Sequence, residues 1–201
     1  VLAIKQTIYR TSEDSPVIQA LRTAAENGKQ VTVLVELKAR FDEKNNILWA
    51  RQLERSGINV IFGFVGLKTH SKITLVVRKE QNKVQRYVHL ATGNYNPDTA
   101  KLYTDIGFFT KNESIGNDAT TFFNLLTGFN IFGNAKNYSK SKAPKFESII
   151  IAPFSLRAKL IECIEREIKN QRKHGSGLII MKVNSLVDKE TIEKLYEASS
   201  K

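Results

Sequence analysis

The sequence predicts an α/β protein with a mixed sheet flanked by helices, and three observations support this class. Apolar, β-branched runs alternate with stretches of helical periodicity over residues 1–64, a pattern typical of parallel strands joined by right-handed crossovers. Two further apolar runs follow with only a short polar turn between them, which predicts an antiparallel hairpin. A strand–helix pattern then begins again after residue 144.

The first third predicts strands over residues 2–9, 31–37 and 58–64. The helix between the first two begins at Ser15-Pro16, an N-cap followed by proline at the first helical position, and ends at Asn27-Gly28. A second helix covers about residues 43–56 and ends before Gly57. The run over 31–37 is almost continuously apolar, as expected for a strand that is covered on both faces.

The remaining elements follow from the same signals. Strands over 72–78 and 83–91 are joined by the polar turn 79–82, and a short strand at 105–110 precedes a helix at 117–126. Residues 134–144 are polar, basic and poor in apolar side chains, so we expect a linker there. Beyond the linker the sequence predicts elements in the order strand, helix, strand, helix, at 148–152, 155–173, 178–183 and 189–199.

The last strand–helix unit resembles the first. A shift of 174 residues aligns Asp188 with Asp14, and it aligns three apolar residues of the two helices, Ile192 with Ile18, Leu195 with Leu21 and Ala198 with Ala24. We therefore expect a first catalytic domain at 1–133, a linker at 134–144, and at 145–201 the incomplete N-terminal part of a second, similar domain. On this interpretation the chain is a fragment of a longer protein.

The composition limits the kinds of partner and the kinds of site that the chain can have. The chain has 201 residues and a formal net charge of +11, which favours polyanionic partners but does not choose among them. A single cysteine excludes an internal disulfide and a cysteine-rich zinc site. No apolar run approaches the roughly 20 residues that cross a bilayer.

A histidine between two lysines is the main candidate for chemistry. In an extended segment Lys68, His70 and Lys72 would lie on one face because side chains alternate along a strand. A neutral imidazole can attack phosphorus while the flanking ammonium groups hold the phosphate. Asn94, in the Gly-containing turn after the hairpin, would orient the imidazole or donate to a phosphate oxygen.

Further cations follow the predicted strands. Arg10 comes directly after the first strand and Arg40 after the second, so both are expected at the sheet edge where ligands bind in open α/β sheets. Guanidinium groups suit phosphate oxygens because they bind them in bidentate fashion. Tyr103 would stack on a nucleotide base, and its alternative is an ordinary core aromatic. The chain has no G-x-x-x-x-G-K-[ST] loop.

Together these motifs resemble known families. The H-x-K followed by a small-Gly-Asn turn resembles the half-site of the phospholipase D superfamily, and longer stretches resemble the bacterial polyphosphate kinase family. The stretches are residues 4–10 (IKQTIYR), 35–43 (VELKARFDE), 66–72 (GLKTHSK), 89–96 (HLATGNYN), 102–105 (LYTD) and 184–188 (NSLVD).

The resemblance implies a phospholipase D-like fold and reversible transfer of the terminal phosphate of ATP to inorganic polyphosphate. It implies His70 as the phosphorylated residue, Tyr103 against adenine, and Arg10 and Arg40 beside a magnesium–phosphate site. We expect these arginines to contact phosphate oxygens, since Mg²⁺ prefers oxygen ligands. Lys68 and Lys72 are added as phosphate-binding and catalytic residues from their spacing alone.

The resemblance also implies ATP, ADP and polyphosphate as partners, Mg²⁺ with the nucleotide, and further domains of the same protein. A homo-oligomer is expected, as is a bacterial cytoplasmic location with peripheral membrane association left open; nucleic acid is not an expected partner. Two alternatives stay open: a phospholipase D-like phosphodiesterase or nuclease half, and a non-catalytic module that binds polyanions. The fragment alone is expected to be inactive.

Overall fold

The computed structural model describes residues 1–9, 15–36, 43–63, 67–127 and 144–201. Within it the chain forms two compact units, Val1–Ile149 and Ile150–Lys201. Each unit has its own packing and is described by itself.

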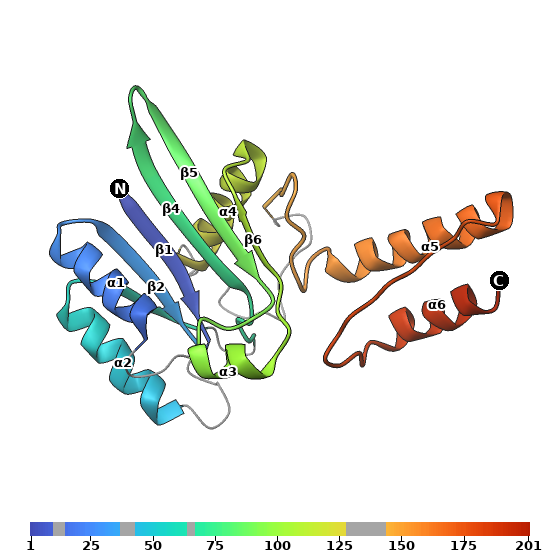
Figure 1. Cartoon of the computed structure of the whole chain (residues 1–201), viewed down its shortest axis with the longest axis horizontal. Helices are drawn as coiled ribbons and strands as arrows, with labels where there is room; N and C mark the ends of the chain where they lie inside the picture. The colour runs from blue at the N-terminus through green and yellow to red at the C-terminus, as the bar shows by residue number, and fades with distance from the viewer. Residues whose placement is uncertain (10–14, 37–42, 64–66, 128–143) are drawn as a thin grey trace. The chain divides into compact units, whose positions relative to one another are not determined.

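One mixed sheet forms the centre of the first unit (Figure 1). Its order is β3-β2-β1-β4-β5-β6, in which β1, β2 and β3 are parallel while β4, β5 and β6 pair antiparallel to their neighbours. This confirms the predicted α/β class with a mixed sheet. The strands are β1 (Ala3–Ile8), β2 (Gln30–Val35), β3 (Asn59–Phe62), β4 (Lys72–Glu80), β5 (Lys83–Ala91) and β6 (Gly107–Thr110).

Helices cover both faces of this sheet. Helices α1 (Pro16–Glu26) and α2 (Glu43–Arg55) pack on one face, and α4 (Glu113–Thr127) packs on the other. Alternation along the strands divides the core accordingly, because successive side chains point to opposite faces. On the α1 face the buried set includes Ile8, Ile18, Leu21, Val33 and Leu53; on the α4 face it includes Leu34, Ile73, Leu75, Val88 and Phe123.

A short helix, α3 (Pro97–Leu102), lies between β5 and β6 and was not predicted. Its N-cap is Asn96, whose side-chain oxygen accepts hydrogen bonds from the backbone N–H groups of Asp98 (2.9 Å) and Thr99 (3.0 Å). An asparagine before proline is a known helix start. The signal was therefore present in the sequence, although the helix itself is too short to show apolar periodicity.

A buried carboxylate anchors the last residues of the first unit. Asp118, on α4 and only 2% exposed, accepts hydrogen bonds from the backbone N–H groups of Glu147, Ser148 and Ile149 at 2.7–3.1 Å. Charge-assisted hydrogen bonds of this kind are among the stronger ones in proteins. The three amides are therefore satisfied by a side chain rather than by a neighbouring strand.

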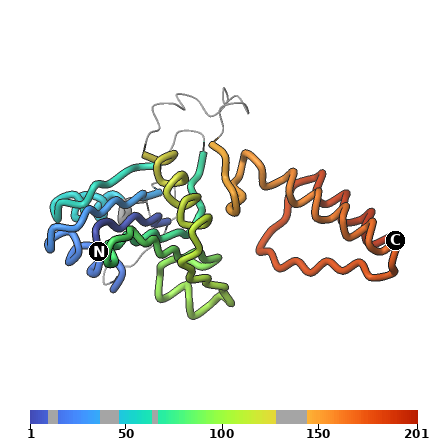
Figure 2. Tube along the Cα trace, turned by 90° about the horizontal axis from the view of Figure 1, so that it is seen from above, coloured from blue at the N-terminus to red at the C-terminus, as the bar shows by residue number. Residues whose placement is uncertain are grey.

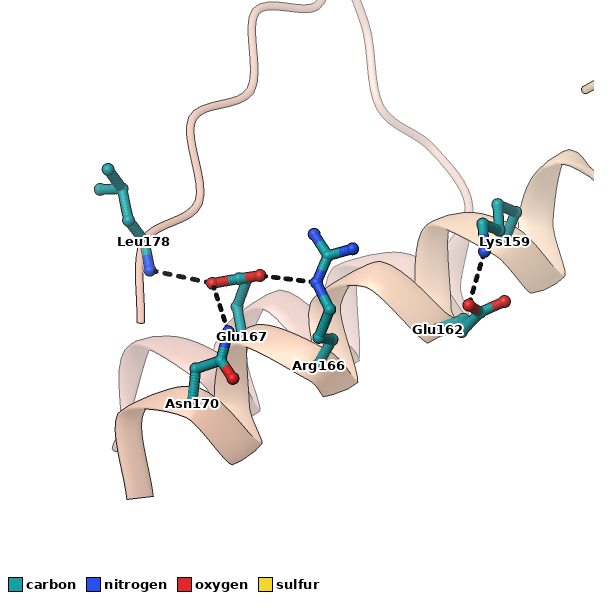
Figure 3. A network of polar contacts seen from close by, with 6 residues as sticks. All are labelled: Lys159, Glu162, Arg166, Glu167, Asn170 and Leu178. Carbon is teal, nitrogen blue, oxygen red and sulfur yellow. Dashed lines mark hydrogen bonds and ion pairs between the residues drawn. The ribbon is translucent and has the colours of Figure 1, made fainter. Parts of the chain in front are cut away.

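The second unit consists of two parallel helices, α5 (Leu156–His174) and α6 (Lys189–Ser199), which lie side by side in Figures 1 and 2. Three ion pairs connect α5 to α6 and to Asp188, the residue before α6. They are Arg157–Asp188, Glu165–Lys194 and Arg172–Glu197, and their residue numbers increase together, as expected for parallel helices. A further network on α5 joins Arg166, Glu167, Asn170 and the backbone N–H of Leu178 (Figure 3). These contacts are largely exposed, so each contributes little to stability.

Two predicted strands are wrong. Residues 148–152 and 178–183 form no strand in the described part of the chain. The first segment begins with amides that are bonded to Asp118, and the second has no partner strand among the described residues. A strand without a partner lacks the ladder that stabilises it, and Leu178, Ile180 and Val183 are exposed.

The predicted repeat remains a prediction: α1 and α6 each have 11 residues, but the strand predicted before α6 is not formed in the described part of the chain. The predicted domain limits 1–133, 134–144 and 145–201 remain a prediction, and residues 128–143 lie outside the described residues. None of the described helices is long and apolar enough to cross a membrane.

Replacing Asp118 by alanine is expected to lower the free energy of unfolding of the first unit by about 1–3 kcal/mol, because three backbone N–H groups lose a charged, buried acceptor. Trp49 is the only tryptophan of the chain and is buried in this unit. Its fluorescence during urea unfolding therefore reports on the first unit. The control is Asp98→Ala, an exposed carboxylate, for which a change within about 0.5 kcal/mol is expected. Equal effects of the two substitutions would contradict the anchoring role.

Candidate functional site

The candidate site lies where the end of β1 meets the start of β4. The buried hydroxyl of Thr7 donates to the carbonyl oxygen of Ser71 (2.7 Å) and accepts from the backbone N–H of Ile73 (3.1 Å). This bridge extends the antiparallel pairing of the two strands. It fixes the residue pair that follows, Tyr9 on one strand end and His70 on the other, next to each other.

The three predicted basic residues gather around the ring of Tyr9. The His70 imidazole meets it at a centroid distance of 4.8 Å and an interplanar angle of 79°. The ammonium groups of Lys68 and Lys72 lie 5.0 Å and 5.2 Å from the centre of the same ring. The prediction that Lys68, His70 and Lys72 lie together is confirmed, although Lys68 and His70 precede β4 and only Lys72 belongs to it.

Lys72 contacts His70 directly. Its Nζ lies 3.1 Å from Nδ1 and 3.0 Å from Nε2 of the imidazole, and it donates to the carbonyl oxygen of His70 at 2.7 Å. An ammonium group has only hydrogens to offer, so it bonds a ring nitrogen that carries no proton. The contact therefore favours the neutral imidazole.

The pKa values of both groups are lowered, and burial is the largest cause in each case. Burial lowers the pKa of His70 below its usual 6.5, and the charges of Lys72 and Lys68 lower it further. Burial also lowers the pKa of Lys72 to about 8, against the opposing charge of Asp105. Between these two pKa values His70 is mostly neutral and Lys72 mostly charged, which is the combination that nucleophilic attack on a phosphate requires.

A buried carboxylate supports the segment that carries Lys68 and His70. Glu36, 2% exposed and directly after β2, accepts a hydrogen bond from the backbone N–H of Thr69 at 2.8 Å. Gly63 passes so close that a Cβ there would lie 2.8 Å from Oε2 of Glu36. Glu36 therefore holds the backbone between Lys68 and His70, and the close approach of residue 63 requires glycine.

The turn after β5 lies at the same end of the sheet. Lys72 is paired with Ala91, and Thr92, Gly93 and Asn94 follow. The Thr92 hydroxyl donates to Asp105 (3.2 Å), and a Cβ at Gly93 would lie only 2.3 Å from the Asp105 carboxylate. The side-chain oxygen of Asn94 is buried and has no hydrogen-bond partner among the described residues.

The remaining predicted site residues divide into two groups. Tyr103 ends helix α3 and is 60% exposed, so the alternative of a core aromatic is wrong and its ring is accessible for stacking. Arg10 and Arg40 lie outside the described residues. Their contact with phosphate remains a prediction.

A polar chain of side chains lies on the sheet beside Lys72. The Thr74 hydroxyl is hydrogen-bonded to Gln6 (3.2 Å) and to the Tyr95 hydroxyl (2.9 Å), which in turn contacts Nδ1 of His89 (2.9 Å). The ring of Phe109 stacks on His89 with centroids 4.2 Å apart. Burial lowers the pKa of His89 and raises that of Tyr95. This arrangement fits a structural role for His89.

Metal ligands are sparse in this region. Among the described residues no group of three or more His, Cys, Asp or Glu side chains is placed to hold a metal ion. Mg²⁺ commonly binds through one or two carboxylates, waters and substrate phosphates rather than in an all-protein cage. The small number of possible ligands among the described residues is compatible with Mg²⁺ that is held mainly by the phosphates of the nucleotide.

Comparison with known proteins now identifies the family. The family "Polyphosphate kinase C-terminal domain 1" matches residues 1–131, and "Polyphosphate kinase C-terminal domain 2" matches residues 149–201. The chain belongs to the polyphosphate kinase family.

Individual relatives agree with this assignment. The chain is 58% identical over 199 residues to a polyphosphate kinase of Halalkalibacterium halodurans and 56% identical to one of Bacillus cereus, covering 99% of this chain and 27% of each relative. The crystal structure of polyphosphate kinase from Porphyromonas gingivalis superposes with a TM-score of 0.78 at 36% identity, covering 98% of this chain and 31% of that one. The chain thus spans about a quarter of the length of the curated relatives, and the predicted phospholipase D-like fold class is confirmed.

Two residues of the candidate site were not predicted from the sequence. Glu36 lies in one of the family motifs but was given no role. A charged residue directly after the apolar strand 31–35 is nevertheless a signal for a buried, hydrogen-bonded carboxylate. Tyr9 precedes Arg10, and the sequence predicts it only as the last residue of a strand. Its proximity to His70 follows from the pairing of β1 with β4, which links residues more than 60 positions apart.

Removing the charge of Lys68 is expected to raise the pKa of His70, because that charge is one of the causes that lower it. The chain has three histidines, so an NMR titration of the imidazole C–H signals can follow each one in the Lys68→Met variant. Lys29→Met, directly before β2 and hence at the opposite end of that strand from Glu36, is the control. An unchanged His70 titration in Lys68→Met would contradict the described electrostatics.

Proposed function

We propose that this chain carries the histidine-bearing half of a polyphosphate kinase active site, with His70 as the residue that is phosphorylated. The full reaction is reversible transfer of the terminal phosphate of ATP to inorganic polyphosphate. The observation that supports it most is the contact of Lys72 with both ring nitrogens of His70 (3.1 Å and 3.0 Å). A neutral imidazole beside a fixed cation suits attack on a charged phosphate.

In the proposed first step the Lys72 ammonium group turns from the imidazole to an oxygen of the γ-phosphate, and the unprotonated ring nitrogen of His70 attacks the γ-phosphorus in line with the leaving oxygen. The N–P bond forms as the bond to the β-phosphate oxygen breaks, and ADP leaves. Lys68 and Lys72 stabilise the charge on the equatorial oxygens. In the second step a terminal oxygen of polyphosphate attacks, the P–N bond breaks, and the imidazole is neutral again.

The other predicted residues have binding roles in this proposal. Tyr103 stacks on adenine, a kind of contact worth about 1–3 kcal/mol, and its exposed ring is accessible for it. Arg10 and Arg40 contact phosphate oxygens, and Mg²⁺ arrives bound to the nucleotide and neutralises phosphate charge. Asn94 orients the imidazole or donates to phosphate. No observation specifically favours a phosphodiesterase or a non-catalytic polyanion module, and relatives that span most of this chain are named as kinases.

Replacing His70 by alanine is expected to abolish phosphoenzyme formation. The measurement uses a full-length polyphosphate kinase that carries this sequence, incubated with γ-labelled ATP. Acid-labile, base-stable label is expected in the parent, and background label in His70→Ala. His174→Ala, at the exposed end of α5, is the control and should keep its label. Full labelling of His70→Ala would exclude His70 as the nucleophile, and cleavage of a phosphodiester without ATP formation from polyphosphate would favour a phosphodiesterase.

The 201 residues alone are expected to give little or no turnover. The resemblance to phospholipase D-like half-sites implies that a second half must face His70, and the chain covers only 27% of its relatives. Polyphosphate synthesis by the isolated chain, measured beside a full-length protein carrying the same sequence, tests this expectation. Comparable rates per molecule would show that these residues contain a complete site.

A further inference from the structure

The ring of Tyr9 is in contact with the side chains of Lys68, His70 and Lys72, and the two ammonium groups among them repel one another. The ammonium groups of Lys68 and Lys72 both lie within about 6 Å of its ring centre, the range of cation–π attraction. The His70 imidazole packs against the same ring in a T-shaped arrangement. Tyr9 therefore contacts every basic group of the Lys68–Lys72 segment.

Two like charges side by side need a compensating group. Among the described residues neither Lys68 nor Lys72 forms an ion pair with an acidic side chain, and Asp105 acts on Lys72 only through its more distant charge. A carboxylate in contact with the ammonium groups would compensate them but would also compete with an incoming phosphate. The face of an aromatic ring carries only partial negative charge, so it attracts both cations and yields them readily to a full anion.

We propose that Tyr9 is a positioning residue, whose ring holds the Lys68 and Lys72 ammonium groups beside the His70 imidazole before the phosphate arrives. This role rests on the function proposed above. The ring rather than the hydroxyl carries it, because both cation contacts and the imidazole contact are made with the ring.

The expected consequence concerns the chemical step more than nucleotide binding. Tyr9 is proposed to act on the groups that surround the γ-phosphate, whereas adenine is assigned to Tyr103. Loss of the ring therefore slows transfer from bound ATP more than it raises the KM for ATP. A residue that only filled space would slow transfer by the same factor whether or not Lys68 carries its charge.

The test compares Tyr9→Phe with Tyr9→Leu in a full-length polyphosphate kinase that carries this sequence. Single-turnover labelling of His70 from saturating γ-labelled ATP is expected to slow about tenfold in Tyr9→Leu, since two cation–π contacts are lost, and to stay within about twofold in Tyr9→Phe. Tyr87→Leu is the matched control, because Arg78 lies 5.9 Å from the Tyr87 ring in the part of the β4–β5 hairpin beyond Lys72. Its labelling rate should not change. Equal rates in Tyr9→Phe and Tyr9→Leu would overturn the proposal.

A double-mutant cycle keeps the test decisive if Tyr9→Leu is less stable. The effect of Tyr9→Leu should be smaller in a Lys68→Met background, because one of the contacts is already absent, whereas a general loss of stability would be the same in both. Identical effects in the two backgrounds would count against the positioning role.

Binding of tripolyphosphate separates this proposal from the proposed function, since it requires no phosphoryl transfer. Calorimetry is expected to show weaker binding in Tyr9→Leu than in the parent, and unchanged binding in Tyr9→Phe. If the parent forms no phosphohistidine, the proposed function fails, while the order of tripolyphosphate affinities still supports or overturns the role of Tyr9.

Discussion

The hydroxyl of Thr7 is the contact on which the site depends. It joins the end of β1 to the start of β4 through Ser71 and Ile73, next to the place where Tyr9 meets Lys68, His70 and Lys72. Without that bridge the two strand ends would each lack a partner for buried polar groups, which is costly in a protein interior. The antiparallel β1–β4 pairing thus does more than extend the sheet. It brings a tyrosine from one strand to the histidine and lysines of another.

The electrostatics of the cluster follow from how it is enclosed. Carboxylates are present, but they serve backbone groups or a hydroxyl: Glu36 accepts from the Thr69 amide, and Asp105 accepts from Thr92. Among the described residues the lysines have an aromatic ring and an imidazole as neighbours. Burial lowers the pKa of Lys72 to about 8, and no carboxylate of the described part of the chain forms an ion pair with its ammonium group. A phosphate entering such a site would supply the compensating charge that the described side chains do not.

Much of the fold and of the candidate site could be predicted from local sequence patterns, and the elements that were predicted wrongly or missed have physical reasons. The three parallel strands and the hairpin were predictable because their apolar runs are long, and Lys68, His70 and Lys72 because they are close in sequence. Residues 178–183 have strand composition, but composition does not supply a partner strand. Helix α3 is too short to show apolar periodicity, so the only signal for it in the sequence is the Asn96-Pro97 start. Tyr9 could not be assigned, because its role arises from strand pairing across more than 60 residues and its own neighbourhood in the sequence is ordinary.

The Asp118 anchor has a consequence for where the first unit ends. Asp118 on α4 accepts hydrogen bonds from the backbone N–H groups of Glu147, Ser148 and Ile149, so these three residues belong to the packing of the first unit although they come well after the end of α4 at Thr127. A shortened chain that keeps Ile149 keeps all of these hydrogen bonds. A chain that stopped before Glu147 would leave a buried carboxylate without them, which is costly in a protein interior.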